Sequence, residues 1–134
     1  MRILALDWGS VRVGAAIADS ATKIAFPLKQ PFESKKAVLE IKRIIQEQEI
    51  GLILLGLPTD LSGKEGKSAE KLKIFADNLF RSVKVPIKLV DERFSSVQAG
   101  KLLKDQGMRV RQQRAIKDNI AAQIMLQQYL DTKK

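Results

Sequence analysis

Residues 52–57 read LILLGL, an uninterrupted apolar run that is followed by Pro58. A short apolar run without alternation is typical of a strand that is buried on both faces of a sheet. Such a strand needs helices on both sides of the sheet. Apolar residues at helical spacing do flank the run, over about 35–49 before it and 68–83 after it. This combination predicts an α/β fold.

The other apolar segments predict a hairpin and further parallel units. Residues 2–7 and 11–18 are apolar and are joined by the tight turn WGS, which favours a β-hairpin. We therefore expect a mixed five-stranded sheet, made of a hairpin followed by βαβ units with helices on both faces, in a single domain over 1–134. The remaining elements are expected as an edge strand at 23–28 containing Pro27, a turn at 31–34 in which Ser34 caps the next helix, a strand at 85–91, and helices at about 96–106 and 111–130.

Composition narrows the chemistry. The chain has no histidine and no cysteine, so Ser-His-Asp and Cys-His catalysis are excluded, and proton transfer would fall to carboxylates, lysine or metal-bound water. A formal net charge of +9 favours a polyanionic partner, most often a nucleic acid. No apolar run approaches the ~20 residues that span a bilayer, and no secretion signal opens the chain. A cytoplasmic protein without a membrane partner is expected.

Three acidic positions are predicted to meet at one end of the sheet. Asp7 ends the first strand and Glu92 follows the last, and ligands of α/β sheets bind beyond the carboxyl ends of strands. On a helical projection of 116–131, Asp118 falls on the apolar face, one turn before Ala121 and Ala122. The polar half of that projection holds Lys117, Asn119, Gln123, Gln127, Gln128 and Asp131. Capping or salt bridging would also explain each acid alone. Together, Asp7, Glu92 and Asp118 suit a pair of Mg²⁺ or Mn²⁺ ions that could catalyse phosphodiester hydrolysis.

Four segments, in order, resemble the YqgF/RuvX family of pre-16S rRNA nucleases, also called Holliday-junction-resolvase-like proteins. They are DWGSVRVGAAIAD (7–19), GLPTDLSGKEG (56–66), DERFSS (91–96) and IKDNIAAQIML (116–126). The resemblance covers almost the whole chain and implies a ribonuclease H-like fold, with the acidic site on Asp7, Glu92 and Asp118. It departs from the family pattern at Trp8, a place more often aliphatic, and at Lys67–Ser68, where Pro-Arg is more usual.

Basic residues around these acids are candidates for holding phosphates, although a charge cluster is more often a solvated face. Arg12 could instead neutralise the acids, and Arg93 could instead orient Glu92. The candidate nucleic-acid-binding residues are Arg12, Lys64, Lys67, Arg93, Arg109, Arg111, Arg114 and Lys117.

Several functions stay open at this point. The resemblance implies maturation of the 5′ end of pre-16S rRNA, with precursor rRNA and ribosomal particles as partners of a monomer or homodimer. Resolution of branched DNA is the first alternative, and a non-catalytic RNA-binding assembly factor is the second. A P-loop at GKEGKS (63–68) fails because Leu61 stands where its first glycine belongs. An actin-like ATPase would need a second domain, for which the chain is too short.

Overall fold

The computed structural model describes residues 1–9, 11–29, 31–57, 67–91 and 110–132, and the side chains of 57, 67–69, 91 and 110–118 lie outside that description. The helix expected at 96–106 also lies outside it. The strands are β1 (Arg2–Asp7), β2 (Arg12–Asp19), β3 (Ile24–Pro27), β4 (Phe32–Glu33), β5 (Ile50–Leu57) and β6 (Ile87–Asp91). The helices are a 3₁₀ turn (Ser34–Lys36), α1 (Ala37–Gln48), α2 (Lys67–Ser82) and α4 (Val110–Thr132).

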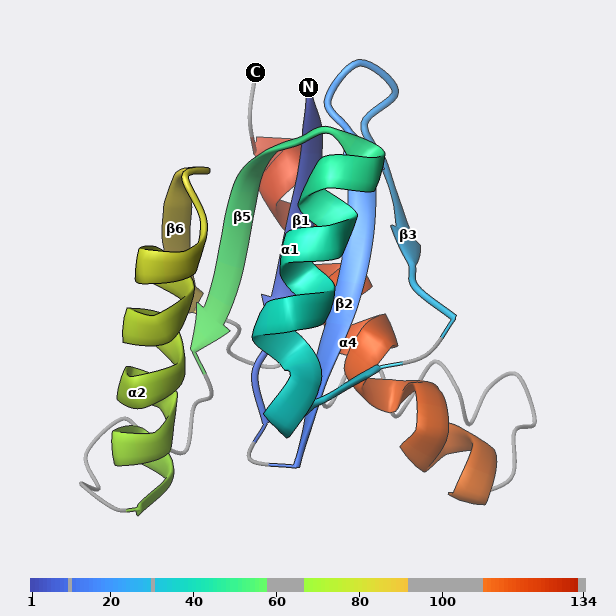
Figure 1. The fold of residues 1–134 in the computed structure, drawn as a ribbon. Coiled ribbons are helices and arrows are strands. Elements are labelled where there is room, and N and C mark those ends of the chain that lie inside the picture. The colour runs from blue at the N-terminus through green and yellow to red at the C-terminus, as the bar shows by residue number, and fades with distance from the viewer. Residues whose placement is uncertain (10, 30, 58–66, 92–109, 133–134) are drawn as a thin grey trace.

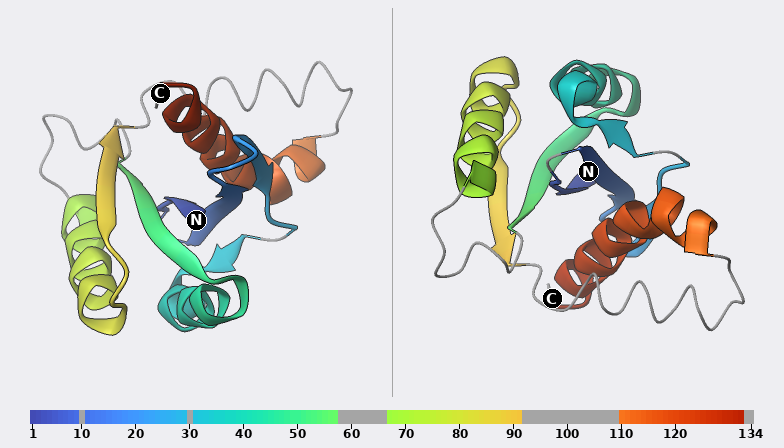
Figure 2. Two further views of the ribbon diagram at one scale, coloured as in Figure 1. Left: turned by 90° about the horizontal axis from the view of Figure 1, so that it is seen from above. Right: turned by 90° about the horizontal axis from the view of Figure 1, so that it is seen from below.

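The strands form one mixed sheet in the order β3-β2-β1-β5-β6, and the short β4 pairs with β2 (Figure 1). Strands β1, β2 and β3 are antiparallel neighbours, whereas β5 is parallel to both β1 and β6. Helices α1 and α2 cover one face of the sheet and α4 covers the other (Figure 2). The predicted α/β architecture is confirmed. No helix in the described ranges is long and apolar enough to cross a membrane.

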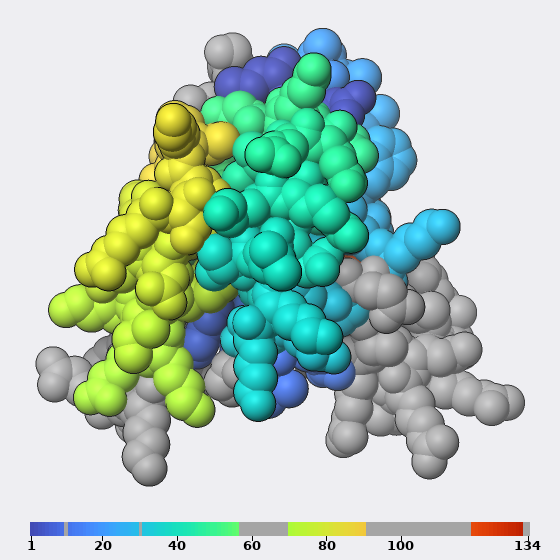
Figure 3. Space-filling model, in the orientation of Figure 1, coloured from blue at the N-terminus to red at the C-terminus, as the bar shows by residue number. Residues whose placement is uncertain are grey.

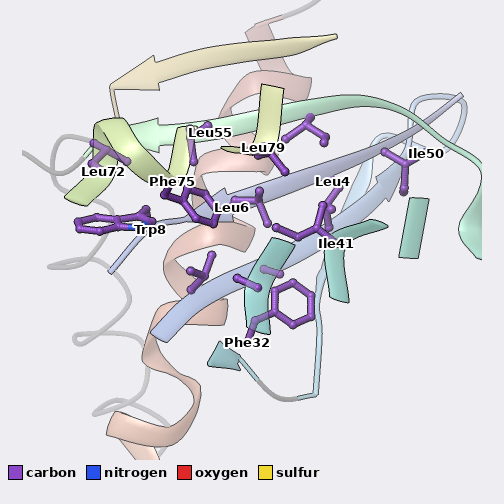
Figure 4. Packing of buried hydrophobic residues seen from close by; sticks show 14 residues of the cluster. Leu4, Leu6, Trp8, Phe32, Ile41, Ile50, Leu55, Leu72, Phe75 and Leu79 are labelled. Atoms are coloured by element: carbon purple, nitrogen blue, oxygen red, sulfur yellow. The ribbon is translucent and has the colours of Figure 1, made fainter. Parts of the chain in front are cut away.

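Strict alternation along β1 divides the core into two layers. Leu4 and Leu6 pack with α1 and α2 in a cluster that includes Trp8 and Phe75 (Figure 4). Ile3 and Ala5 point the other way, into a cluster with Ala122, Met125 and Leu126 of α4. Because side chains along a strand alternate with a period of two, Asp7 belongs to the α4 face.

The turn expected at 31–34 is wrong in part. Phe32 and Glu33 form β4, which pairs with Val13 and Arg12 of β2, and the Phe32 side chain enters the core. Ser34 does not cap α1: it begins the 3₁₀ turn, and its hydroxyl lies 3.5 Å from the carbonyl of Gly9, to which it donates. Burial of the Phe32 ring favours an extended backbone here over a free turn.

The edge strand β3 is protected by amide side chains of α4. The backbone N–H of Ala25 donates to Gln127 Oε1 (3.0 Å), and its carbonyl accepts from Gln123 Nε2 (3.1 Å). Gln127 Nε2 also donates to the carbonyl of Lys23 (3.0 Å). An open edge of this kind invites pairing with another chain, so these amides complete the hydrogen bonding that the sheet leaves unsatisfied.

Gly9 is required by a close backbone approach, not by a left-handed conformation. A Cβ there would lie 2.6 Å from the carbonyl oxygen of Arg12. Gly9→Ala should therefore force the β1–β2 turn to shift, and we expect the free energy of unfolding to fall by about 1–3 kcal/mol. Gly51→Ala is the matched control, since its Cβ would come too close only to the exposed side chain of Met1, which can move, and would lie at an ordinary 3.9 Å from the carbonyl oxygen of Arg2. Equal losses in the two variants, measured by urea unfolding, would contradict the steric argument.

Candidate functional site

Asp7 is a buried carboxylate at the carboxyl end of β1, with only 7% of its surface exposed. Its register partners on the neighbouring strands are both glycines, Gly14 on β2 and Gly56 on β5. No side chain therefore rises from either neighbouring strand beside this carboxylate. A charged group is costly to bury unless hydrogen bonds or a cation compensate it, so this carboxylate is a candidate metal ligand.

The carboxyl ends of the three parallel strands meet at the level of Asp7. Gly56 of β5 is the register partner of Asp7 on one side and of Val90 of β6 on the other. Since neighbouring strands lie about 4.8 Å apart, the backbones at Asp7 and Val90 are separated by about 10 Å. Val90 packs in the α4-side cluster, so it shares the face of Asp7. Asp91 is the last residue of β6.

Asn119 fixes α4 to the sheet next to this level. Its side chain is fully buried; Oδ1 accepts from the N–H of Ala15 (2.8 Å) and Nδ2 donates to the carbonyl of Leu28 (2.7 Å). The N–H of Leu28 donates directly to the carbonyl of Ala15. The return bond, from the N–H of Ala15 to the carbonyl of Leu28, is replaced by the Asn119 amide, which bonds to both groups. Ala15 is the neighbour of Gly14, the register partner of Asp7.

The helical projection is confirmed for the apolar face of α4 and is wrong for Asn119. Ala121, Ala122, Met125 and Leu126 are buried against the sheet as expected. The projection places Asn119 on the polar half of the helix together with Gln123 and Gln127. All three instead bond to the backbone of the β2–β3 region, because a turn-to-turn row of amides can replace missing strand partners. Only the spacing of four residues between these amides hints at this role in the sequence.

The predicted acids are described to different extents. Asp118 lies in the first half of α4, immediately before the anchored Asn119, but its side chain is outside the described residues. Glu92 lies outside them altogether. Within the described residues no three acidic, histidine or cysteine side chains come close enough to hold a metal ion. The three-acid cluster therefore stays a prediction, of which the structure describes the position of Asp7.

The donor chemistry at Asp7 suits a hard divalent cation. Carboxylate oxygens and water are the ligands that Mg²⁺ and Mn²⁺ prefer. Asp7 presents such oxygens in a buried setting, and its register partners on both neighbouring strands, Gly14 and Gly56, carry no side chain. The residues present fit the expected metal.

Arg12 is the candidate phosphate-binding residue whose side chain is described. It begins β2 two residues before Gly14, so alternation places it on the same face as Asp7, and it is exposed. Lys67 begins α2, and the first half of α4 carries Arg111, Arg114 and Lys117, but their side chains lie outside the described residues. Lys64, Arg93 and Arg109 are outside the described residues entirely.

Solved structures that resemble the chain share its fold. RuvC of Thermus thermophilus, solved in complex with a Holliday junction substrate, aligns with a TM-score of 0.61 and covers 97% of this chain and 93% of its own. Fowlpox virus resolvase, solved with Holliday junction DNA, aligns with a TM-score of 0.51 over 97% and 99% of the two chains. The identities are 11% and 13%, so these likenesses establish the RuvC-like, ribonuclease H-like fold.

Comparisons of sequence give the family. A protein of Chloroflexus aurantiacus named "Putative pre-16S rRNA nuclease" is 37% identical over 134 residues, covering 98% of this chain and 88% of the relative. A protein of Anaeromyxobacter sp. with the same name is 39% identical, covering 98% of this chain and 97% of its own. The family model described as "RuvX: Holliday junction resolvase" matches residues 1–132. The chain therefore belongs to the RuvX family.

Proposed function

We propose that this chain is a nuclease that uses Mg²⁺ or Mn²⁺ to hydrolyse phosphodiester bonds of nucleic acid, and that its substrate is precursor 16S rRNA at its 5′ end. The observation that carries the proposal is the buried Asp7, placed between two glycines at the carboxyl edge of a RuvC-like sheet. The names of the relatives support the choice of rRNA.

The proposed catalytic and metal-binding residues are Asp7, Glu92 and Asp118. Glu92 comes two positions after Val90, which is on the face of Asp7, and continued alternation would give Glu92 that same face. Asp118 comes one position before Asn119, which ties α4 to β2 beside the register partner of Asp7. These relations support a site made by three distant parts of the chain.

Each part of the proposed site has a defined task. The carboxylates would hold the ions and fix their positions relative to the sheet edge. The bound ions would supply an activated water and neutralise charge on the leaving oxygen. Arg12, on the same face as Asp7, would hold a substrate phosphate near the acids. The other basic residues named above would add phosphate contacts along the strand.

Resolution of Holliday junctions is a second candidate, favoured by the description of the family model. The same carboxylates could cut branched DNA, since the chemistry at the phosphodiester is shared. The two candidates differ in the shape of the nucleic acid that must be held, so substrate comparison can separate them.

The decisive experiment presents both substrates to the purified full chain. A precursor 16S rRNA with its 5′ extension and a four-way DNA junction are incubated side by side with Mg²⁺, with Mn²⁺ and with EDTA. Metal-dependent cleavage of the rRNA at its 5′ side is expected. Cleavage of the junction alone would support the second candidate. Tight RNA binding without cleavage of either substrate would overturn both and indicate an assembly factor.

Binding to nucleic acid should weaken steeply as salt rises. The chain carries 24 Lys and Arg against 15 Asp and Glu, and each phosphate contact releases condensed counterions. For about four contacts on a single strand, log Kd should rise with log salt with a slope near 3. Fluorescence anisotropy of a labelled RNA between 50 and 300 mM KCl, in EDTA to prevent cleavage, measures this slope. An affinity independent of salt would contradict the charged-surface argument.

A further inference from the structure

A groove of about 660 Å³ runs between α1 and α2, on the face of the sheet opposite α4. Trp8, the residue after Asp7, contributes to its lining. In Figure 3 the hollow lies between the green-yellow α2 and the teal α1, with dark-blue atoms of the N-terminal segment visible between them. The groove therefore starts at the same edge of the sheet as Asp7 but lies on the other face.

Among the residues that the structure describes, the charged side chains lining the groove are all cations. They are Lys35 beside α1 and Lys71 and Arg81 on α2. All three are exposed, and none has a hydrogen bond or ion pair within the part of the chain that the structure describes. Cations held near each other without acidic partners raise the local potential, which favours an anionic occupant.

The groove is elongated along α2. Lys71, Asn78 and Arg81 recur at helical spacing and therefore share one face of the helix. Arg81 comes ten positions after Lys71 on the helix, which corresponds to a rise of about 15 Å. A single small anion would contact one end only, whereas a chain of phosphates could contact both.

Trp8 provides a further indication that the groove is a binding site. The residue is 6% exposed, and its indole N–H has no hydrogen-bond partner among the described residues. A buried donor without an acceptor is uncommon in folded proteins and costs about 1–3 kcal/mol. An acceptor that entered the groove and displaced part of its lining would satisfy this donor.

We infer that the groove holds the phosphate backbone of the nucleic-acid strand on one side of the cleavage site. The inference rests on the proposed function, because it takes the strand to pass Asp7 and continue over the sheet edge past Trp8. Lys35, Lys71 and Arg81 bind separate phosphates along the strand, and the aliphatic parts of the lining face the sugars. The groove thus lengthens the substrate-binding surface onto the α1–α2 face.

Trp8 is the sole tryptophan of the chain, so intrinsic fluorescence reports directly on the groove. The full chain in EDTA is titrated with a single-stranded 12-nucleotide RNA, and Trp8 emission and the anisotropy of a labelled copy are followed together. We expect both to change with the same midpoint. Constant Trp8 emission while anisotropy rises to saturation would overturn the inference.

Variants test the cations. Lys71→Ala combined with Arg81→Ala should weaken RNA binding about tenfold at 0.1 M salt and lower the salt slope by about 1.4. The matched control combines Lys73→Ala with Lys84→Ala, which removes the same charge from exposed residues outside the groove lining. Equal affinities of the two double variants would overturn the inference.

A titration with AMP is a further test. Saturation of the Trp8 signal by AMP without displacement of RNA would also overturn the inference, since that identifies a free nucleotide as the occupant.

The outcomes separate this inference from the proposed function. If Asp7→Asn abolishes cleavage and the groove variant binds RNA normally, the groove inference fails and the nuclease proposal stands. If the groove variant loses RNA while Asp7→Asn cleaves normally, the nuclease site is wrong and the groove stands as a binding surface.

Discussion

Replacing Asp7 by Asn is expected to abolish metal-dependent cleavage while leaving the fold and nucleic-acid binding intact. The amide keeps the size of the carboxylate but removes its negative charge and one of its two acceptor oxygens. Loss of a ligand to catalytic cations removes several kcal/mol of transition-state stabilisation, and about 4 kcal/mol corresponds to a thousandfold in rate. We therefore expect the cleavage rate on precursor 16S rRNA to fall by at least about a thousandfold.

Three further measurements make this result specific to the site. The free energy of unfolding of Asp7→Asn should not fall by more than about 1 kcal/mol, because burial of a charge is itself unfavourable. Asp77→Asn, an exposed acid of α2, is the matched control and should cleave at the parental rate. RNA affinity in EDTA should be the same for all three proteins. Parental cleavage by Asp7→Asn would show that the site has been assigned wrongly.

The sheet and the position of Asp7 could be predicted from the sequence because both depend on local patterns. LILLGL marked the interior strand β5, and the hairpin of β1 and β2 followed from two apolar runs joined by a short turn. A carboxylate that ends such a strand must lie at the end of the sheet where the parallel strands have their carboxyl ends. The pairing of Asp7 with Gly14 and Gly56 could not be predicted in the same way, since strand register depends on the whole sheet.

Assigning residues to the core or to solvent by their polarity gives the wrong result where polar side chains hydrogen-bond to the backbone. A helical projection treats Asn119 as a residue for solvent, yet it is completely buried because a strand pair needs its amide. The prediction for Phe32 was wrong in the opposite direction. This residue follows Pro31 in an apparent turn, yet it pairs with β2 as part of β4 and its side chain lies in the core. In both cases a contact with β2, distant in sequence, decided the outcome.

Asn119→Ala is expected to be the most destabilising change among the amides of α4. It leaves the N–H of Ala15 and the carbonyl of Leu28 without their partner in a fully buried setting. Each unsatisfied buried group costs about 1–3 kcal/mol, so the free energy of unfolding should fall by about 2–6 kcal/mol. Urea unfolding followed by circular dichroism measures the loss.

Gln123→Ala is the matched control for this prediction. Gln123 is less buried and donates one bond, to the carbonyl of Ala25 at the outer edge of β3, where water can replace it. We expect a loss of no more than about 1 kcal/mol. Comparable losses in the two variants would show that Asn119 has no special role in joining α4 to β2.

The same pair of variants connects stability to the proposed chemistry. Without its amide bridge, α4 is free to shift along β2, and Asp118 would move with it relative to Asp7. A displacement of about 1 Å in a catalytic constellation can cost a hundredfold in rate. Asn119→Ala should thus lose about a hundredfold in kcat at a temperature where it remains folded, with RNA affinity in EDTA unchanged, whereas Gln123→Ala should keep the parental kcat. If Asn119→Ala is destabilised but cleaves at the parental rate, the amide bridge holds the fold together without positioning the acid.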